Sequence, residues 1–197
     1  MYTLIGSLTS PYVRKLRLFF QQINLSHELK SINYLEENDS NYLKKINPIN
    51  KIPVLLINDE PLYDSRVIYY YLAKKHQIKE LSLKEENYLS AIDGAMDSSI
   101  NLFSLRRGGM DITPGKNSYI DRQRARVEEI LDYITPYAKS LDPKNPADWN
   151  FVSISLYTYL FWANFREMLD LSNRPELTAF LERFKDMPGV SETTPKV

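Results

Sequence analysis

The sequence predicts an α+β section followed by an all-α section. Three observations support this division. Short apolar runs alternate with helical patterns up to about residue 77, a polar connection follows from residue 76 to 83, and no strand-like run occurs after Leu83. A chain of 197 residues can form one domain or two small ones.

The first section is expected to run strand, helix, strand, helix, strand, strand, helix. Pro11 favours the first turn of the first helix, on which Arg14, Lys15 and Arg17 are expected to face outward. The second strand alternates in character like an edge strand. The expected strands are residues 2–5, 26–32, 54–57 and 62–63, with a turn at 58–61, and the expected helices are 11–24, 38–46 and 65–75.

The second section is expected to contain helices only. Its third helix, capped by Asn150, is apolar nearly all round, which predicts that it forms the core of this section. Pro136 lies near the end of the second of these helices, where it can kink the chain. The expected helices are residues 85–107, 119–140, 151–168 and 174–185, followed by a tail at 187–197.

Composition excludes several classes of function. Apolar residues make up 43% of the chain and the formal net charge is zero, which argues against a nucleic-acid-binding surface. No apolar window is long enough to span a membrane and no secretory signal is recognised, so a cytoplasmic protein without a membrane partner is expected. With no cysteine and only two histidines, a metal site, a disulfide or a cysteine nucleophile is not expected.

The stretch that ends at Ser65 groups polar features suited to a peptide ligand. Pro53 begins an apolar strand, so Ile52 beside it presents backbone N–H and C=O groups. Asp64 and Ser65 precede a helix, whose first amides and dipole favour an anion, and Lys51 adds a positive charge. This set suits a small peptide with two carboxylates, although a turn, a strand-starting proline and an ordinary helix cap would have the same pattern.

Four segments match the pattern of a known family: Thr9–Lys15, Asn47–Leu55, Asp64–Ser65 and, as the central helix of the second half, Asn150–Arg166. The first three segments and the second half of the chain resemble serine-type glutathione transferases, most closely small bacterial members of the YibF type. One segment resembles the active-site turn, another the loop before the family's cis-proline, and a third its acidic residue–serine pair. Asn150 and Ser153 stand where relatives commonly have a Ser/Thr-x-x-Asp cap.

This resemblance implies the glutathione transferase fold. A thioredoxin-like domain with a mixed four-stranded sheet would span residues 1–77, and an all-helical domain would span residues 84–197. Glutathione is the implied co-substrate, a homodimer the implied assembly, and the Ile52–Pro53 bond would be cis. The implied roles are Ser10 facing the glutathione sulfur, Lys51 the glycyl carboxylate, Ile52 the cysteinyl backbone beside Pro53, and Asp64 with Ser65 the γ-glutamyl end.

The implied chemistry is activation of the glutathione thiol. A hydroxyl donor at a helix N-terminus stabilises a thiolate, and Ser10 precedes the helix that Pro11 opens. Thr9 is the rival donor, and Ser10 could also serve only as a helix cap. Serine cannot form a mixed disulfide, so conjugation or peroxide reduction is favoured over thiol exchange. Tyr12, Phe103 and Trp162 are candidates for contacting a small electrophilic second substrate, and each is equally plausible as a core residue.

The sequence is compatible with two other functions. A protein of the same fold could bind a partner without catalysis, as in stringent-starvation-type relatives, because fold alone does not decide function. A glutathione-dependent isomerase is a further alternative. The presence of Ser10, Lys51, Pro53 and Ser65 together favours the transferase.

Overall fold

The computed structural model describes residues 1–195, which form two compact units. The first unit contains Met1–Glu80 together with the described residues from Asp186 onward, and the second is Leu81–Lys185. The predicted second domain spans residues 84–197, whereas residues 186–195 group with the first unit. Residues 196–197 of the expected tail lie outside the described residues.

The first unit is built on a mixed four-stranded sheet in the order β2-β1-β3-β4. β1 is parallel to β2, because the helix between them carries the chain back across the sheet, and the β1–β3 and β3–β4 pairs are antiparallel. This confirms the predicted fold class for the first section. The strands are β1 Tyr2–Gly6, β2 Glu28–Ser31, β3 Val54–Ile57 and β4 Glu60–Tyr63.

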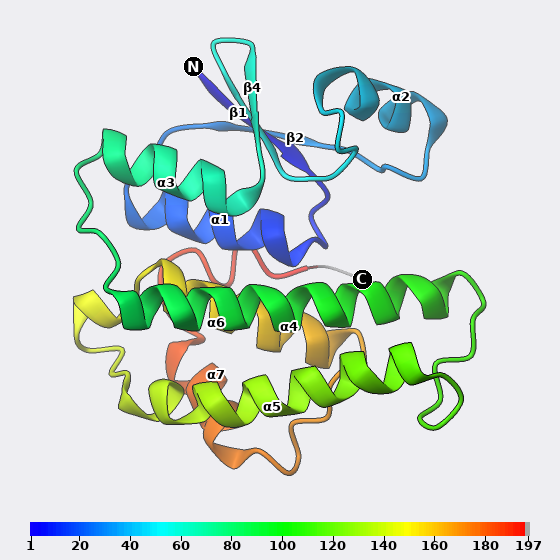
Figure 1. Ribbon diagram of the computed structural model, residues 1–197. Coiled ribbons are helices and arrows are strands. Elements are labelled where there is room, and N and C mark those ends of the chain that lie inside the picture. Colours follow the sequence, from blue (N-terminus) through cyan, green and yellow to red (C-terminus); the bar gives the residue numbers. More distant parts are fainter. Residues whose placement is uncertain (196–197) are drawn as a thin grey trace. The chain divides into compact units, whose positions relative to one another are not determined.

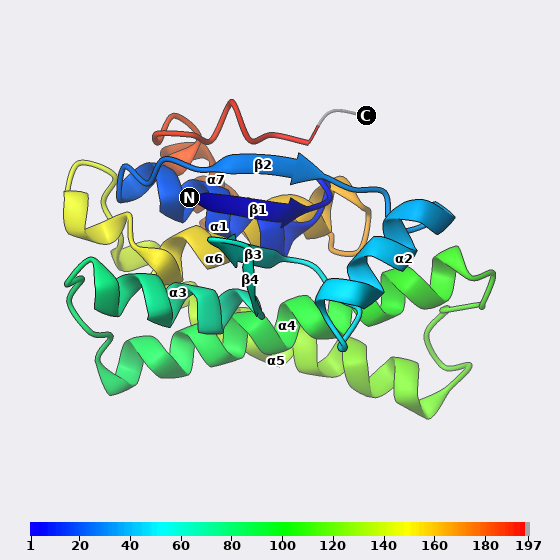
Figure 2. The ribbon, with the colours of Figure 1, turned by 90° about the horizontal axis from the view of Figure 1, so that it is seen from above.

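Three helices cover this sheet: α1 Pro11–Gln22, α2 Glu37–Ile46 and α3 Ser65–Lys75. Helices α1 and α3 pack side by side, as Figures 1 and 2 show. Ile5 of β1 and Val54 of β3 pack in one cluster with Leu43 of α2. Because side chains alternate along a strand, the fully buried Leu4 and Leu55 point to the opposite face.

The hairpin that joins β3 to β4 is tighter than predicted. Asn58 and Asp59 alone form the turn, and both have positive φ (50° and 71°), as the two central residues of a type I′ hairpin do. β4 therefore begins at Glu60 instead of residue 62. Pro61 is tolerated inside it because β4 is an edge strand of the sheet.

The prediction that Arg14 faces solvent is wrong, since its side chain is only 2% exposed. Arg14 Nε donates to Thr193 Oγ1 at 3.2 Å, and one Nη donates to the Val190 carbonyl at 3.1 Å and to Thr194 Oγ1 at 3.2 Å. Residues 190–194 thus cover this part of α1. Lys15 is also buried, at 0% exposed.

The second unit contains α4 Leu83–Arg107, α5 Ser118–Ser140, α6 Phe151–Phe165 and α7 Pro175–Phe184, with a short 3₁₀ turn at Pro146–Asp148. Helix α6 packs against α4 and α7 and is buried almost throughout, which confirms it as the core of this unit. Among the described residues, no helix is both long enough and apolar enough to cross a membrane.

Caps explain the boundaries that differ from the prediction. α4 begins two residues early because Ser82 and Glu85 form a capping box. α6 ends at Phe165, before the predicted residue 168, and Glu167 then adopts a positive φ of 54° that is typical of helix ends. At its start, Asn150 accepts from the Ser153 N–H and Ser153 Oγ accepts from the Asn150 N–H at 2.9 Å, so serine takes the part of the missing acidic residue.

Candidate functional site

Strand register brings three polar segments of the first unit to one end of the sheet. Ile5 pairs with Val54, so the residues that follow β1 and those that precede β3 lie at the same end. Val54 also pairs with Tyr63, so the residues that follow β4 lie there too. The segments that meet are Ser7–Ser10, Lys51–Pro53 and Asp64–Ser65, which contain all the predicted residues for glutathione.

The segment before β3 is held by one buried side chain. Asn47 is 1% exposed, its Nδ2 donates to the Lys51 carbonyl at 2.7 Å, and its Oδ1 accepts from the Ile49 N–H at 2.9 Å. The Asn50 N–H also donates to the Asn47 carbonyl at 2.9 Å. Asn47 therefore pairs with the Ile49 N–H, the Asn50 N–H and the Lys51 carbonyl, and so helps to fix where Lys51 and Ile52 lie.

Backbone groups of Ile52 are available at the end of this loop. The Ile52–Pro53 bond is cis, as the resemblance implied. Pro53 is buried, Ile52 is half-buried, and Lys51 extends an exposed side chain. Within residues 1–195, neither the N–H nor the C=O of Ile52 has a hydrogen-bond partner. Backbone donors and acceptors of this kind are normally paired, so an extended peptide could pair with them.

Asp64 holds the N-terminus of α3 from a strained backbone conformation. Its Oδ1 accepts from the N–H groups of Arg66 at 2.9 Å and Val67 at 3.1 Å. Its backbone has φ 74° and ψ 125°, a combination that costs a residue other than glycine free energy. Ser65, the first residue of α3, is 4% exposed. Strain of this kind concentrates at functional sites, which supports a binding role for this pair.

Ser10 is the N-cap of α1. Its Oγ accepts from the Val13 N–H at 3.4 Å, and its own N–H donates to the Ser7 carbonyl at 3.1 Å. Pro11 opens the helix. The Oγ atoms of Ser7 and Thr9 are hydrogen-bonded to each other at 3.1 Å. Of the three hydroxyls, that of Ser10 is therefore the one positioned by a helix N-terminus, where an anion is favoured.

The three residues predicted to contact a second substrate belong to different units. Tyr12 lies in α1, is half-buried, and has Lys15 Nζ 5.0 Å from its ring centroid. Phe103 of α4 and Trp162 of α6 make an edge-on ring contact with centroids 5.6 Å apart. Trp162 is 5% exposed, so most of its surface packs within the protein, while Phe103 is half-buried.

Sequence reasoning missed two residues that shape the site. Asn47 was part of a matched segment but had no role, and its position before Pro48 was the signal available. Gly6 ends β1 where α1 approaches closely, since a Cβ there would lie 2.3 Å from Val13 Cγ2. Only glycine fits this contact, which sets the distance between the strand and the helix that bears Ser10.

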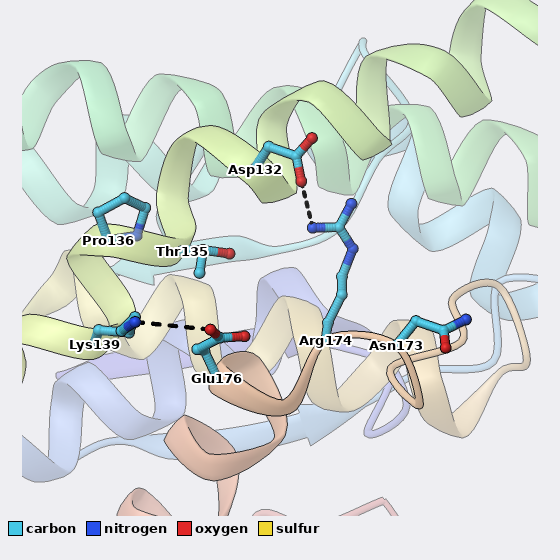
Figure 3. Close-up of a pocket in the computed structure, with 7 residues that line it drawn as sticks. All are labelled: Asp132, Thr135, Pro136, Lys139, Asn173, Arg174 and Glu176. Carbon is cyan, nitrogen blue, oxygen red and sulfur yellow. Dashed lines mark hydrogen bonds and ion pairs between the residues drawn. The ribbon is translucent and has the colours of Figure 1, made fainter.

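The second unit has a separate surface hollow of about 540 Å³ between α5 and the start of α7 (Figure 3). Its charged groups pair with one another: Arg174 contacts Asp132 at 2.7 Å, and Lys139 contacts Glu176 at 3.7 Å. Arg174 also pairs with Glu128 at 2.7 Å. The charged side chains that line this hollow are therefore paired within the second unit. Within the described part of the chain, no three His, Cys, Asp or Glu residues could together hold a metal ion.

Comparisons with known proteins agree with this architecture. Residues 4–80 match the glutathione S-transferase N-terminal domain. The uncharacterized GST-like protein YibF of Escherichia coli K12 is 27% identical over 202 residues, which cover 98% of each chain. A glutathione transferase family member from Pseudomonas fluorescens Pf-5, solved with bound glutathione, is 26% identical, has a TM-score of 0.82, and is matched over 100% of each chain.

A glutathione S-transferase from Methylobacterium radiotolerans, solved in complex with glutathione sulfonate, has a TM-score of 0.84 at 23% identity. The match covers 100% of this chain and 95% of the other. The similarity thus includes both the sheet-containing unit and the helical unit. Residues 4–80 thus match the glutathione S-transferase N-terminal family, and the whole chain is similar in sequence and fold to glutathione S-transferases.

Proposed function

We propose that this protein is a serine-type glutathione transferase that activates the glutathione thiol for attack on a small electrophile. The observation that carries the proposal is the convergence, at one end of the sheet, of the helix-capping hydroxyl of Ser10, the unpaired backbone groups of Ile52 and the carboxylate of Asp64, whose backbone is strained. Relatives of similar length and fold were solved with glutathione or glutathione sulfonate bound, which supports the same ligand here.

The backbone of glutathione is proposed to extend the sheet at Ile52. The cysteinyl residue of glutathione has one N–H and one C=O that match the unpaired C=O and N–H of Ile52. Lys51, exposed next to it, supplies a positive charge for the glycyl carboxylate. This arrangement would set the position of the thiol by backbone pairing.

The γ-glutamyl end is proposed to bind at the start of α3. Its α-carboxylate suits the N-terminus of a helix, at the backbone and hydroxyl of Ser65. Its ammonium group suits Asp64, whose Oδ1 caps the helix and whose Oδ2 has no hydrogen-bond partner within residues 1–195. The two opposite charges of this end thus meet two complementary groups.

Ser10 is proposed to stabilise the thiolate. A free thiol has a pKa near ~8.5, so it is mostly protonated at neutral pH, although the thiolate is the nucleophile. Since Ser10 Oγ already accepts from the Val13 N–H, its own O–H can donate to the sulfur. The sulfur then attacks an electrophilic carbon, forming a C–S bond while the leaving group departs with its electron pair. With a peroxide it attacks one oxygen instead, forming an S–O bond as the O–O bond breaks and the alkoxide departs with the bonding pair. A second glutathione thiol then displaces water from this sulfenic acid to give glutathione disulfide.

Tyr12, Phe103 and Trp162 are proposed to contact the second substrate, and a homodimer is the proposed assembly. Aromatic side chains suit the apolar body of an electrophile, and the similarity to glutathione transferases supports both the second substrate and the dimer. Size-exclusion chromatography with light scattering would test the assembly directly.

Affinity chromatography and one pair of variants test the proposed function. The protein should be retained on glutathione resin and eluted by free glutathione. Ser10→Ala should also be retained but conjugate about 10²-fold more slowly at neutral pH, the order expected for loss of one oxyanion donor. The matched control Thr9→Val should keep the wild-type rate. Flow-through of the wild type would favour a non-catalytic binding protein, and slow turnover in Thr9→Val alone would assign the donor role to Thr9.

A further inference from the structure

Two arginines approach the ring of Phe103 at the ends of α4 and α6. The guanidinium carbon of Arg166 lies 5.5 Å from the Phe103 ring centroid, and that of Arg106 lies 5.8 Å from it. The Arg166 guanidinium also lies 5.0 Å from the ring centroid of Phe165. With Trp162 beside Phe103, this cluster joins two cations to three aromatic side chains, all within the second unit.

Arg106 has an evident structural role. Its Nη groups donate to the backbone carbonyls of Arg166 at 2.6 Å and Glu167 at 3.4 Å, just beyond the last turn of α6. Carbonyls at the C-terminus of a helix carry partial negative charge, so the Arg106 cation is offset by the end of α6. The side chain therefore links α4 to α6 without needing a further anion.

No comparable structural role explains the position of the Arg166 guanidinium. Its Nε is buried, and within the described chain it has no hydrogen-bond partner. None of the carboxylates described lies within ion-pair distance of this guanidinium. Buried polar groups almost always have a partner, so an unpaired guanidinium nitrogen calls for a ligand, an ion or water.

The surroundings of Arg166 suit an anion joined to a flat ring. The residue is half-buried, so part of its guanidinium meets solvent. Contacts with Phe103 and Phe165 hold the guanidinium in place, so less conformational entropy is lost when the guanidinium binds an anion. A guanidinium matches the two oxygens of a carboxylate or sulfonate, and the exposed parts of the two phenyl rings offer an apolar surface next to it.

We propose that Arg166 binds an anionic group on the second substrate, so that the protein prefers electrophiles in which a carboxylate or sulfonate is attached to an aromatic ring. The chemical class follows from the charge of Arg166 and the rings of Phe103 and Phe165. This inference rests on the proposed transferase function, because it assigns the cluster to the second substrate of that reaction.

A matched pair of electrophiles tests the preference in the full-length protein. 4-Chloro-3-nitrobenzoate and 4-chloro-3-nitrobenzamide differ in charge but little in shape. The wild type should have the higher kcat/KM with the benzoate, and Arg166→Gln should reduce the benzoate-to-benzamide ratio about tenfold, the order expected for one hydrogen bond to a charged group. Arg122→Gln, which removes an exposed charge from α5, should leave the ratio unchanged. An unchanged ratio in Arg166→Gln would overturn the inference.

A binding measurement separates failure of this inference from failure of the proposed function. The unreactive 4-methyl-3-nitrobenzoate is titrated into wild type and Arg166→Gln by calorimetry without glutathione, with 4-methyl-3-nitrobenzamide as the neutral control. Binding of the benzoate should weaken about tenfold in the variant and that of the benzamide should not change. The inference is overturned if the variant binds both ligands more weakly by the same factor, or if the wild type does not bind the benzoate. This holds even if the protein is retained on glutathione resin. If retention is lost but the benzoate still depends on Arg166, the transferase function fails and the anion site stands.

Discussion

Asp64 is predicted to lower the stability of the fold through its strained backbone, while its carboxylate contributes to glutathione binding. Its backbone has φ 74° and ψ 125°, which costs a non-glycine residue about 1–3 kcal/mol. Against this, its carboxylate caps α3 by accepting from the N–H groups of Arg66 and Val67. Loss of such a cap to alanine typically costs about 1 kcal/mol, and loss to glycine only a few tenths of a kcal/mol, about 0.3.

Backbone strain and helix capping together predict different stabilities for two variants of Asp64. Asp64→Ala loses the cap and keeps the strained backbone, so its free energy of unfolding should fall by about 1 kcal/mol. Asp64→Gly relieves the strain and loses little capping, although glycine gains about 0.5–1 kcal/mol of entropy in the unfolded chain. Asp64→Gly should therefore be more stable than Asp64→Ala by about 1–3 kcal/mol.

Glutathione affinity should not follow this order of stability. Both variants lack the carboxylate proposed to bind the γ-glutamyl ammonium, so both should bind glutathione about tenfold more weakly. Asp64→Asn is the matched control, because it keeps a capping oxygen and removes only the charge. It should retain most of the wild-type stability and lose affinity like the others.

Urea denaturation and calorimetric titration with glutathione measure the two properties separately. If Asp64→Gly proved no more stable than Asp64→Ala, the positive φ would not store strain. If either variant kept wild-type affinity for glutathione, Asp64 would have no part in binding it, and the proposed orientation of the tripeptide would be wrong.

Three further predictions follow from the packing around the site and in the helical unit. Gly6→Ala should lower the free energy of unfolding by about 1–3 kcal/mol and slow turnover, because its Cβ would overlap Val13. The double variant with Val13→Ala should recover part of the stability and part of the rate, as unfolding and rate measurements would show. Asn47→Ala should raise the KM for glutathione more than it lowers kcat, since the Lys51 carbonyl loses its partner; an unchanged KM would contradict this. Burial raises the pKa of Tyr159, so its phenol stays protonated in the folded protein while it ionises near pH ~10 in the unfolded chain. The free energy of unfolding should therefore fall above that pH, and it should fall less steeply in Tyr159→Phe, as urea titrations across alkaline pH would show.

Local sequence signals predicted the parts of the site that depend on single residues. Pro11 at a helix start, the cap at Asp64 and the proline before a buried strand each identify a boundary through one stereochemical preference. The order of elements in the first unit followed from these signals. The long apolar pattern of α6 likewise predicted a buried helix, because no face of it suits water.

Features that depend on tertiary contact could not be predicted in this way. Arg14 looked like a surface residue because its burial results from the return of residues 186–195, far away in the sequence. Gly6 and Asn47 matter through a close helix approach and a loop hydrogen bond, neither of which has a periodic signature. The hairpin at Asn58 was placed two residues too long because Pro61 was read as part of the turn instead of an edge strand.

The pKa of the glutathione thiol in the bound complex tests the central claim most directly. It is measured from the ultraviolet absorbance of the thiolate as a function of pH, with the wild type and Ser10→Ala each saturated with glutathione. The account predicts a wild-type value at least about one unit below the free-thiol value of ~8.5, and a return toward that value in Ser10→Ala. A wild-type value equal to that of free glutathione, or an equally low value in both proteins, would contradict it.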